Sequence, residues 1–498
     1  MYRLTLYYLI FLVAVAIVLS RFGLVNTNPA DLVISSLIAT GVCFVANYVF
    51  AKLFNAVTNV ESVFITALIL TLIIPTSLPG NLTFIIIASV LAMAAKYLLT
   101  VEKRHLFNPA AVSVLAISLI SPEHAATWWI GTPAMLPFVL VGGLLLLRKI
   151  RREDMVFIFL IVYLAVIGIG SLISSTSVST VVTILQISIL HSAVFFFAFV
   201  MLTEPLTSPS TERLRGFYAG FIAILYSTPM LRFISVGLTP EMALCIGNVF
   251  SYIISPNYRL GLFLNKKLQL SQDTYSFVFN KQKNFRFLPG QYMEWTLPHK
   301  NADSRGVRRY FSISSSPTEE NLEMTVKFYD PSSSYKKELI TLSSKKQIVA
   351  AQVAGDFTLP ENLKTPLVFI AGGVGIAPFR SMIRYIIDKN LSADIILLYT
   401  NRTVNDILYA DIFEKAKSNG VKTIYNLTDV KNAPQDWRGT TGYLTSQTIQ
   451  ERIPDYKKRK YYLSGPQLMV QNFEETLRKT GVAGNQIKTD FFPGYSEK

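Results

Sequence analysis

A change in composition near residue 257 constrains this 498-residue chain more than any other feature of its sequence. Before that point, long apolar stretches recur with short polar connections, and after it the chain changes to short alternating stretches separated by Gly and Pro turns. The mean hydropathy of the whole chain is +0.38, which is too high for an ordinary soluble protein. We therefore expect a polytopic α-helical membrane domain at 1–257, a β-barrel domain at 258–363 and an α/β domain at 364–498.

Ten apolar segments approach or reach the length of about 20 residues that a helix needs to cross a bilayer. They cover residues 4–20, 32–51, 61–75, 82–100, 109–121, 127–147, 155–173, 180–202, 216–234 and 240–255. The first follows Arg3 but lacks a small-residue cleavage site, so we interpret it as a membrane helix and not as a signal peptide.

The positions of Lys and Arg predict the orientation of these helices, because both residues favour the cytoplasmic side. With both termini inside, eleven of the thirteen basic residues of this region lie on the cytoplasmic side: Arg3, Lys52, Lys96, Lys103, Arg104, Arg148, Lys149, Arg151, Arg152, Arg213 and Arg215. Only Arg21 and Arg232 lie outside. The sequence thus predicts a multi-pass protein of the plasma membrane, in contact with lipid, with both termini in the cytoplasm.

Formal charge is also divided unevenly along the chain. Residues 1–257 carry a net +4, which leaves +11 of the total +15 for the C-terminal part. A basic surface suits anionic lipid or a phosphate-bearing cofactor, so the charge gives no reason to expect a nucleic-acid partner.

Two apolar segments end in polar, proline-rich runs at corresponding places in the two halves of the membrane domain. The third segment leads into Ile74-Pro75-Thr76-Ser77-Leu78-Pro79-Gly80, and the eighth leads into Thr203-Glu204-Pro205-Leu206-Thr207-Ser208-Pro209. Each segment is third in a set of five, and the two runs fall on opposite membrane faces. This pairing is typical of inverted repeats with interrupted helices, whose broken ends hold ligands or ions. Taken singly, either run also fits an ordinary loop at a helix end.

Three motifs in the membrane half carry a resemblance to a known family: Leu106-Phe107-Asn108-Pro109-Ala110-Ala111, the run Thr66-Ala67-Leu68-Ile69-Leu70 before Pro75, and Thr203-Glu204-Pro205-Leu206-Thr207-Ser208. Over about residues 30–255 the chain resembles the NqrB/RnfD family, whose members are membrane proteins of the sodium-translocating NADH:quinone reductase and of the Rnf complex. The resemblance implies a ten-helix inverted repeat, bound FMN or riboflavin, and electron passage through the membrane. The membrane-site residues that it implies are Asn108, Pro109, Thr203, Glu204, Thr207 and Ser208.

That family commonly attaches FMN to a Thr in a Ser-Gly-Ala-Thr-like sequence, and this chain has no such sequence. The nearest candidate is Thr180 in Ser177-Val178-Ser179-Thr180, which we expect in an outside loop. A loop rich in Ser and Thr is also an ordinary polar connector. Covalent FMN at Thr180, a dissociable flavin and no flavin at all in the membrane domain therefore stay open.

The sequence offers few ligands for metal cofactors. Its two cysteines, Cys43 and Cys245, cannot supply the four thiolates of an iron–sulfur cluster. Of its four histidines only His191 falls within a predicted span, so the facing pair of a bis-His haem is missing. We predict no iron–sulfur cluster, no haem and no other metal, and a functional or a structural role for His191.

In the soluble half, Arg309-Tyr310-Phe311-Ser312-Ile313-Ser314-Ser315-Ser316-Pro317 begins as a strand that presents Arg309 and Ser312 to a ligand. The planar fork of Arg309 suits a pyrophosphate. Short alternating stretches on either side predict a small barrel. Ser334 precedes a predicted helix at 336–342, where it would either offer a phosphate site or act as an ordinary N-cap.

From Pro366 onwards, strands alternate with helices. The predicted strand 367–371 leads into Gly372-Gly373-Val374-Gly375-Ile376-Ala377-Pro378, whose glycines permit close approach of a dinucleotide, although their spacing is not G-x-G-x-x-G. Two further predicted strands, 395–399 and 460–463, end near Arg402 and at Ser464. Ligands collect at the carboxyl ends of parallel strands, so we expect these three loops to lie together.

The order of these motifs resembles the ferredoxin–NADP reductase superfamily over about residues 258–498. The resemblance implies FAD on the barrel, NAD(P)H on the α/β domain, and hydride transfer from nicotinamide C4 to flavin N5. The residues that it implies for catalysis are Ser312 and Ser464, and those for cofactor binding are Arg309, Tyr310, Phe311, Ser312, Ser334, Gly372, Gly373, Gly375, Ile376, Pro378, Arg402, Gly465, Pro466 and Tyr495. Phe311 replaces the usual Tyr, and Ser464 stands where many relatives carry Cys.

Together the two halves predict a membrane-bound NAD(P)H-oxidising flavoprotein. Electrons would pass from cytoplasmic FAD through a flavin-type membrane domain to a quinone or to an extracytoplasmic flavoprotein. We expect NADH more than NADPH, although Arg402 fits a 2′-phosphate as well as a ribose. The alternatives are a redox-driven sodium pump and a transporter with a regulatory reductase module.

Overall fold

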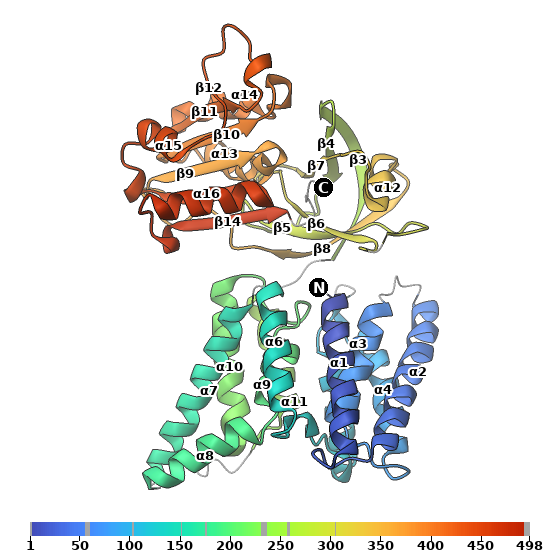
Figure 1. The fold of residues 1–498 in the computed structure, drawn as a ribbon. Helices are drawn as coiled ribbons and strands as arrows, with labels where there is room; N and C mark the ends of the chain where they lie inside the picture. The colour runs from blue at the N-terminus through green and yellow to red at the C-terminus, as the bar shows by residue number, and fades with distance from the viewer. Residues whose placement is uncertain are drawn as a thin grey trace. The chain divides into compact units, whose positions relative to one another are not determined.

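The computed structural model describes residues 2–54, 60–101, 104–150, 152–174, 177–230, 237–255, 259–303 and 305–492. The chain divides into two compact units, Met1–Asn257 and Tyr258–Lys498. The first, the helical unit, consists almost entirely of helices, whereas the second, the reductase unit, contains two sheets with helices around them (Figure 1).

The described part of the helical unit contains eleven α-helices. They are α1 (Tyr2–Arg21), α2 (Pro29–Leu53), α3 (Val60–Ile73), α4 (Leu82–Leu98), α5 (Pro109–Ile120), α6 (Leu136–Ile150), α7 (Glu153–Ile173), α8 (Val178–Leu190), α9 (Val194–Phe196), α10 (Glu212–Ser227) and α11 (Pro240–Ile254). A π-helix, η3 (Phe197–Met201), continues α9, and a short hairpin, β1 (Thr100–Val101) and β2 (Arg104–His105), joins α4 to α5.

A helix lies in each of the ten predicted segments, but fewer helices reach the length of a span. Among the described residues, α1, α2 and α7 are long and apolar enough to cross a membrane. A fourth candidate joins α8 to Val194–Met201 through a bend of 55°. The helices α3, α4, α5 and α11 are apolar but shorter. The ten-span topology therefore stays a prediction.

The eighth predicted segment contains a correction. We expected His191 inside a continuous helix, but α8 ends before it and His191 caps the helix, with its backbone N–H donating to the carbonyl of Ile187. We also expected Thr180 in a loop, whereas Thr180 lies in the first turn of α8. A polar N-cap at Ser177 begins the helix there, because its hydroxyl accepts a hydrogen bond from the Thr180 backbone N–H.

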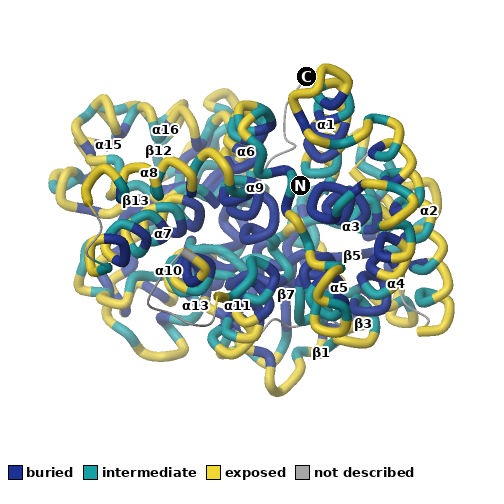
Figure 2. Tube along the Cα trace, turned by 90° about the horizontal axis from the view of Figure 1, so that it is seen from below, coloured by how far each residue is buried: buried dark blue, intermediate teal, exposed yellow. Residues whose placement is uncertain are grey.

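The helices of the helical unit pack in matching combinations. In the first half α2 packs against α3 and α4, and in the second half α7 packs against α8 and α10. The helices α5 and α11 also pack against each other. Exposed positions recur along α2 (Figure 2), and among them are large apolar residues such as Leu37, which is 68% exposed, and Val45, which is 61% exposed. Apolar residues around the outside of a helical unit are what a lipid-facing surface requires.

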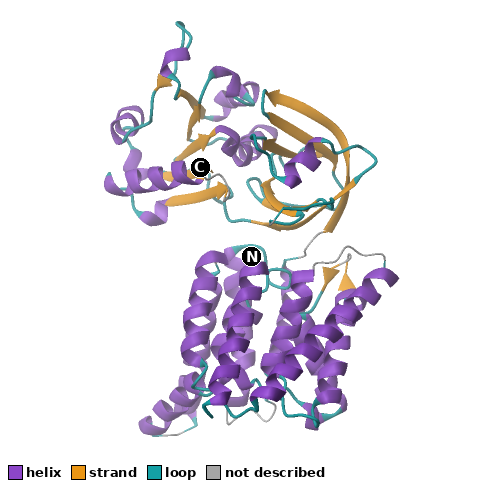
Figure 3. Ribbon diagram, turned by 45° about the vertical axis from the view of Figure 1, so that its right-hand side comes forward, coloured by secondary structure: helices purple, strands orange, loops and turns teal. Residues whose placement is uncertain are grey.

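The reductase unit contains the strands of the structure's larger sheets (Figure 3). It begins with a six-stranded antiparallel sheet in the order β6-β5-β8-β3-β4-β7. Its strands are β3 (Arg259–Ser271), β4 (Thr274–Asn280), β5 (Tyr292–Thr296), β6 (Arg308–Ser312), β7 (Asn321–Lys327) and β8 (Gln347–Ala354), and it carries the short helix α12 (Ser334–Ile340). Aromatic side chains fill its core, among them the fully buried Trp295 and Tyr335. These strands form the barrel-like domain.

A second six-stranded sheet follows, and all of its strands are parallel, in the order β12-β11-β10-β9-β13-β14. They are β9 (Leu367–Gly372), β10 (Ile395–Asn401), β11 (Val421–Leu427), β12 (Thr440–Thr441), β13 (Lys460–Pro466) and β14 (Ile487–Phe492). The helices around them are α13 (Ala377–Asp388), α14 (Ala410–Lys415), α15 (Ser446–Arg452) and α16 (Gln467–Lys479). Separate hydrophobic cores cover the two faces, as a parallel sheet requires.

The order of the strands in this sheet reverses at β9. From β9 the chain moves to β10 and β11 on one side, and it later returns to place β13 on the other side of β9. In such sheets ligands bind outside the carboxyl ends of the strands at the point where the order reverses. The crevice between β9 and β13 is therefore where a ligand is expected.

Candidate functional site

At the carboxyl ends of β9 and β13, the loop Gly372–Gly375 lies very close to the run that begins at Ser464 and Gly465, and we call this close approach the loop crossing. A Cβ atom on Gly375 would lie 2.3 Å from the carbonyl oxygen of Ser464, and one on Gly372 would lie 2.2 Å from the sulfur of Met469. Gly373 adopts a φ of +53°, in the region that favours glycine. The crossing thus explains these glycines and brings three predicted cofactor residues beside Ser464.

The rest of this loop begins the helix α13. Ile376 is fully buried, and Pro378 stands in the first turn of α13, where a missing N–H has no cost. Gly465 and Pro466 are the last residues of β13, directly opposite. All of the predicted residues between Gly372 and Pro378 and between Ser464 and Pro466 therefore lie at one place in the fold.

Several buried polar atoms at these strand ends have no hydrogen-bond partner within the described ranges. They are the hydroxyls of Ser312, Thr400 and Ser464 and both amide atoms of Asn401. Ser464 is fully buried and Ser312 is 4% exposed. Nearly all buried polar groups in folded proteins are paired, because an unpaired one costs about 1–3 kcal/mol. Unpaired groups at the ends of β6, β10 and β13 fit a site whose ligands complete the pairing.

Arg309 on β6 belongs to a charged cluster at the edge of the barrel. Its Nη2 lies 3.1 Å from Asp303 Oδ1, its Nη1 donates to the carbonyl of Gly306 at 2.9 Å, and its guanidinium lies 5.1 Å from the centre of the Tyr335 ring. Burial lowers the pKa of Arg309 from its ordinary value, although the side chain stays a cation at neutral pH. The fork is thus held by its neighbours in a fixed direction.

Lys336, in the first turn of α12, adds a further cation to this cluster, and no motif in the sequence pointed to it. Burial, followed by the charges of Arg305 and Arg309, lowers its pKa to about 8. Burial is the larger cause of this lowered pKa, and only the smaller contribution of the two arginines reflects a positive local potential, which favours an anion. The cluster fits the diphosphate of FAD.

Ser334 does not act as the N-cap of α12. Ser333 caps the helix, since its hydroxyl accepts a hydrogen bond from the Lys336 backbone N–H. The Ser334 hydroxyl accepts from the Asp303 backbone N–H at 2.9 Å and lies 3.0 Å from His299 Nε2. Ser334 therefore ties the Asp303 loop to the helix beside Arg309.

The remaining side chains of β6 face two ways, as alternation along a strand requires. Phe311 lies on the side of Arg309, with its ring 6.0 Å from the Tyr335 ring. Tyr310 is 44% exposed, and its hydroxyl donates to Glu294 Oε2 at 2.9 Å. Arg309 and Phe311 therefore lie on one side of the strand and Tyr310 and Ser312 on the other, so the expectation that one side presents both Arg309 and Ser312 to a ligand is wrong.

Two predicted residues stand apart from this arrangement. Arg402 is exposed beyond the end of β10, where its carbonyl accepts from the Asp429 backbone N–H at 3.1 Å. Tyr495 lies outside the described residues. Asn401, directly before Arg402, was not predicted, although a polar residue at the carboxyl end of a buried strand was the available signal.

In the helical unit, the predicted membrane-site residues form a hydrogen-bonded network around one carboxylate. Asn108 caps α5, accepts from the Ala111 N–H, and donates to Glu204 Oε2 at 2.7 Å. Thr207 donates to the same oxygen at 3.3 Å. Pro109 is the first residue of α5. The polar run after η3 and the start of α5 are therefore joined by hydrogen bonds, and a ligand site at this place stays a prediction.

Further residues extend this network. Ser208 donates to the Glu204 carbonyl and accepts a hydrogen bond from Arg152, and Thr203 donates to the Phe199 carbonyl at 2.8 Å. Sequence reasoning missed four members of the network, among them His105, whose Nε2 lies 3.6 Å from Glu204 Oε1. The other three are Arg152, Tyr218 and Asn248.

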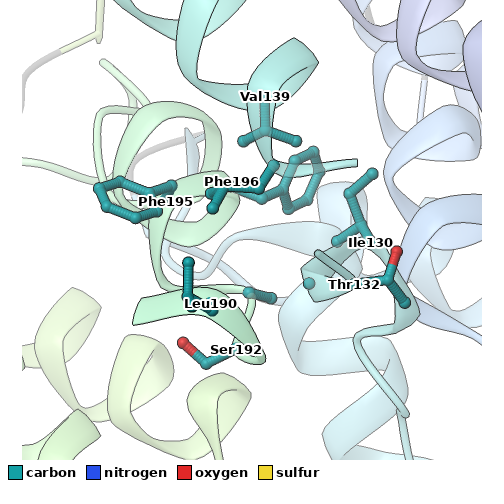
Figure 4. Close-up of a pocket in the computed structure, with 10 residues that line it drawn as sticks. Ile130, Thr132, Val139, Leu190, Ser192, Phe195 and Phe196 are labelled. Atoms are coloured by element: carbon teal, nitrogen blue, oxygen red, sulfur yellow. The ribbon is translucent and has the colours of Figure 1, made fainter. Parts of the chain in front are cut away.

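Two small cavities lie within the helical unit. One adjoins the network and is lined by His105, Thr207, Asn248 and Tyr252 among others. The other lies at the break between α8 and α9, where Leu190, Ser192 and Phe196 face Ile130 and Val139 (Figure 4). Thr180 lines neither cavity, and its hydroxyl lies 2.9 Å from that of Ser177.

Comparison with known proteins covers the reductase unit. Two family models match, "Oxidoreductase FAD-binding domain" at residues 262–358 and "Oxidoreductase NAD-binding domain" at residues 369–475. These matches fall on the antiparallel sheet and on the parallel sheet, respectively.

Curated relatives include a monooxygenase reductase subunit, NADH-cytochrome b5 reductases and flavohemoproteins. The chain is 27% identical over 215 residues to the glycine betaine monooxygenase reductase subunit of Chromohalobacter salexigens, covering 42% of this chain and 56% of that protein. It is 28% identical over 241 residues to NADH-cytochrome b5 reductase 1 of Emericella nidulans, covering 46% of this chain and 76% of that protein. The chain thus spans little more than half the length of the first relative.

Among solved structures, the Amycolatopsis cytochrome P450 reductase GcoB matches with a TM-score of 0.42 and 22% identity, over 48% of this chain and 70% of that one. The family matches and the curated relatives agree on the class of the C-terminal part. Residues 262–358 and 369–475 therefore form the FAD-binding and NAD-binding domains of an NAD(P)H-dependent FAD oxidoreductase, similar to NADH-cytochrome b5 reductase.

Proposed function

We propose that the whole chain is a membrane-bound oxidoreductase that passes electrons from cytoplasmic NAD(P)H, through FAD in the reductase unit and a redox site in the helical unit, to a quinone or an extracytoplasmic flavoprotein. One observation carries the first half of this proposal. Among the described residues, the buried hydroxyls of Ser312, at the end of β6, and of Ser464, near the carboxyl end of β13, have no hydrogen-bond partner, and the two cofactors would have to meet there.

The chain's own residues have distinct tasks in this reaction. Arg309 and Lys336 supply positive charge for the FAD diphosphate, Ser312 offers its hydroxyl to the flavin ring, and the Gly372–Gly375 loop leaves room for the dinucleotide beside Ser464. FAD accepts the two electrons of a hydride together and releases them one at a time, which suits a relay of single-electron sites.

The second half of the proposal rests on the helical unit. Its apolar helices and apolar outer surface support a multi-pass plasma-membrane domain. The matching packing of α2 with α4 and of α7 with α10 supports an inverted repeat. The network around Glu204 supports a ligand site at the broken helix end, for which the resemblance to the NqrB/RnfD family suggests FMN or riboflavin.

Cofactor analysis of the purified full chain tests both halves. We expect acid-extractable FAD, and anaerobic bleaching of its absorbance by NADH faster than by NADPH. A chain that binds no FAD, or FAD that neither nucleotide bleaches, contradicts the first half. Flavin fluorescence that stays with the polypeptide on a denaturing gel, and that Thr180→Val removes, would identify covalent FMN.

The relay needs its own measurement. In liposomes containing a quinone, we expect NADH oxidation to reduce the quinone, and a protein with FAD alone and no quinone reduction contradicts the relay. The carboxylate of Glu204, whose side chain is 21% exposed, also suits a cation, which favours a redox-driven sodium pump as the second candidate. Turnover that depends on sodium, together with sodium uptake into sealed vesicles, would distinguish the pump from simple electron transfer.

A further inference from the structure

Away from the strand ends, a buried arginine joins the two domains of the reductase unit. Arg380 lies in the first turns of α13, and its side chain is 8% exposed. Its guanidinium donates to both carboxylate oxygens of Glu319, donates to the Ser314 carbonyl at 3.0 Å, and lies 3.2 Å from Glu323 Oε2. One cation of the NAD-binding domain is thus surrounded by two carboxylates and a carbonyl of the FAD-binding domain.

Tyr409 completes this arrangement from the start of α14. Its ring lies 5.4 Å from the Arg380 guanidinium, and its hydroxyl lies 2.6 Å from Thr325 Oγ1 and 3.1 Å from Glu323 Oε1. Tyr409 has a φ of 59°, a left-handed conformation that is uncommon for a bulky side chain. Such a conformation costs about 1–3 kcal/mol and persists where surrounding contacts hold it. Here those contacts cross from one domain to the other.

The sequence positions of these contacts connect them to the proposed cofactor site. Ser314 follows Ser312 by two residues, and Arg380 follows Pro378 by two residues. Ser381, next to Arg380, donates to the carbonyl of Ser315 at 2.6 Å. The contacts therefore join the loop after β6 to α13, the helix that follows the Gly372–Gly375 loop.

The charges of this cluster fix the relative orientation of its groups more than they stabilise the fold. Burial opposes the charge on Arg380, but Glu323 and Glu319 outweigh it and raise the pKa of Arg380 above its ordinary value. Buried ion pairs add little net stability, because desolvation of the charges offsets their attraction. A guanidinium that donates to both oxygens of one carboxylate does fix the relative orientation of the two groups.

We propose that Arg380, Glu319, Glu323 and Tyr409, the interdomain clamp, set the position of the nicotinamide against the flavin. This inference rests on the proposed hydride transfer in the reductase unit. The clamp residues are positioning residues, since they act through the loops that carry Ser312 and Gly375. Because a misplacement of about 1 Å between reacting groups costs on the order of a hundredfold in rate, loosening the clamp should slow hydride transfer without releasing FAD.

The chain contains a matched control within one domain. Arg459, directly before β13, is as buried as Arg380, and it donates to Asp394 at 2.9 Å and to Asp455 at 2.8 Å. Its partners lie at the opposite ends of the strands from Ser464, within the NAD-binding domain. Arg459→Gln thus removes a similar ion-pair network that joins no second domain.

The experiment compares Arg380→Gln, Glu319→Gln and Tyr409→Phe with Arg459→Gln in the full chain. We expect Arg380→Gln to keep its FAD and to lower the rate of anaerobic flavin reduction at saturating NADH about ten- to a hundredfold. Glu319→Gln should have a smaller effect, Tyr409→Phe the smallest, and Arg459→Gln none. Hydrogen exchange in peptides covering 312–319 and 372–381 should rise together in Arg380→Gln and stay unchanged in Arg459→Gln.

Two results would overturn the clamp. One is an unchanged reduction rate in Arg380→Gln, and the other is an equal loss of rate in Arg459→Gln. If Arg380→Gln does not fold, Glu319→Gln and Tyr409→Phe carry the test with the same readouts. A wild-type chain that neither nucleotide reduces contradicts the proposed function, whereas exchange that rises in only one of the two peptide regions contradicts the clamp alone.

Discussion

The polar sites of the two units differ in whether their polar groups have hydrogen-bond partners within the chain. In the reductase unit, the hydroxyls of Ser312 and Ser464 are buried without a partner among the described residues. In the helical unit, Asn108, Thr207 and Glu204 bond to one another. The first arrangement suits groups that a ligand must pair, whereas in the second these three side chains already have partners within the chain.

This difference has an energetic meaning. An unpaired buried hydroxyl costs the folded state free energy until a ligand pairs it, so its removal should harm function and leave stability unchanged. When one side chain of a hydrogen-bonded network is removed, its partners are left unpaired, so its removal should lower the stability of the fold directly. The two sites should therefore respond in opposite ways to similar truncations.

A methyl group at the loop crossing should have the largest effect. In Gly375→Ala the new Cβ meets the backbone of Ser464 at 2.3 Å, which flexible side chains cannot relieve. We expect a loss of about 3 kcal/mol in the free energy of unfolding and greatly weakened NADH binding, because the loops must separate. Calorimetric unfolding and NADH titration measure the two effects.

The helical unit supplies the control for this change. Gly168 in α7 has no atom within 4 Å of a Cβ position, so Gly168→Ala should raise stability by up to about 1 kcal/mol. Equal destabilisation by both substitutions would show that the crossing is looser than its distances indicate.

Truncation in the Glu204 network should come next in size. Asn108→Ala removes a donor from the carboxylate and the cap from α5, and we expect it to lower the free energy of unfolding by about 2 kcal/mol. Thermal unfolding in detergent, with Glu204→Gln and the double variant beside it, measures the coupling. Additive losses would contradict a shared network, since residues in contact show coupled losses.

Ser312→Ala should show the opposite response. It removes an unpaired hydroxyl, so without FAD we expect a change in unfolding free energy below about 0.5 kcal/mol. Flavin reduction by NADH should nevertheless slow about tenfold, as expected when a transition-state hydrogen bond is lost. Stopped-flow measurement of flavin reduction tests the rate, and unfolding of the FAD-free protein tests the stability. A variant that is destabilised without FAD but reduces flavin at the normal rate would contradict the contrast between the two sites.

Sequence alone predicted most of the reductase site because its signals are local. The glycines after β9 and the Ser-Gly-Pro run that ends β13 stand in short motifs, and the rule for parallel strands placed them together. Arg380 and Tyr409 carry no such signal, since their roles depend on Glu319 and Glu323, which lie 61 and 86 residues away from them, respectively. The strands β8, β11 and β14 were also missed.

In the helical unit, hydropathy located the helices but not all of their ends. The helix α3 ends at Ile73, where the proline-rich run begins, so composition marked this end. The eighth segment breaks at His191, and an apolar run continues across that place, so composition does not reveal the interruption there. The sequence named Asn108, Glu204 and Thr207 as site residues but not the hydrogen bonds that join them, and it gave no signal for Asn248, which comes from another segment.

The smallest effect concerns protons at the cation cluster. With its pKa near 8, Lys336 is neutral in the folded reductase unit at about pH 9, whereas an unfolded lysine keeps its proton up to about pH 10.4. The unfolded chain therefore binds more protons in this window, and stability without FAD should rise with pH from about 8 to about 10.

Bound diphosphate would favour the charged lysine, so FAD binding should take up a fraction of a proton at about pH 9 and almost none at pH 7. Calorimetric titration in buffers of different ionisation enthalpy measures this uptake, with Lys336→Met as the control. Proton release, or equal uptake by the variant, would place the FAD diphosphate away from Lys336.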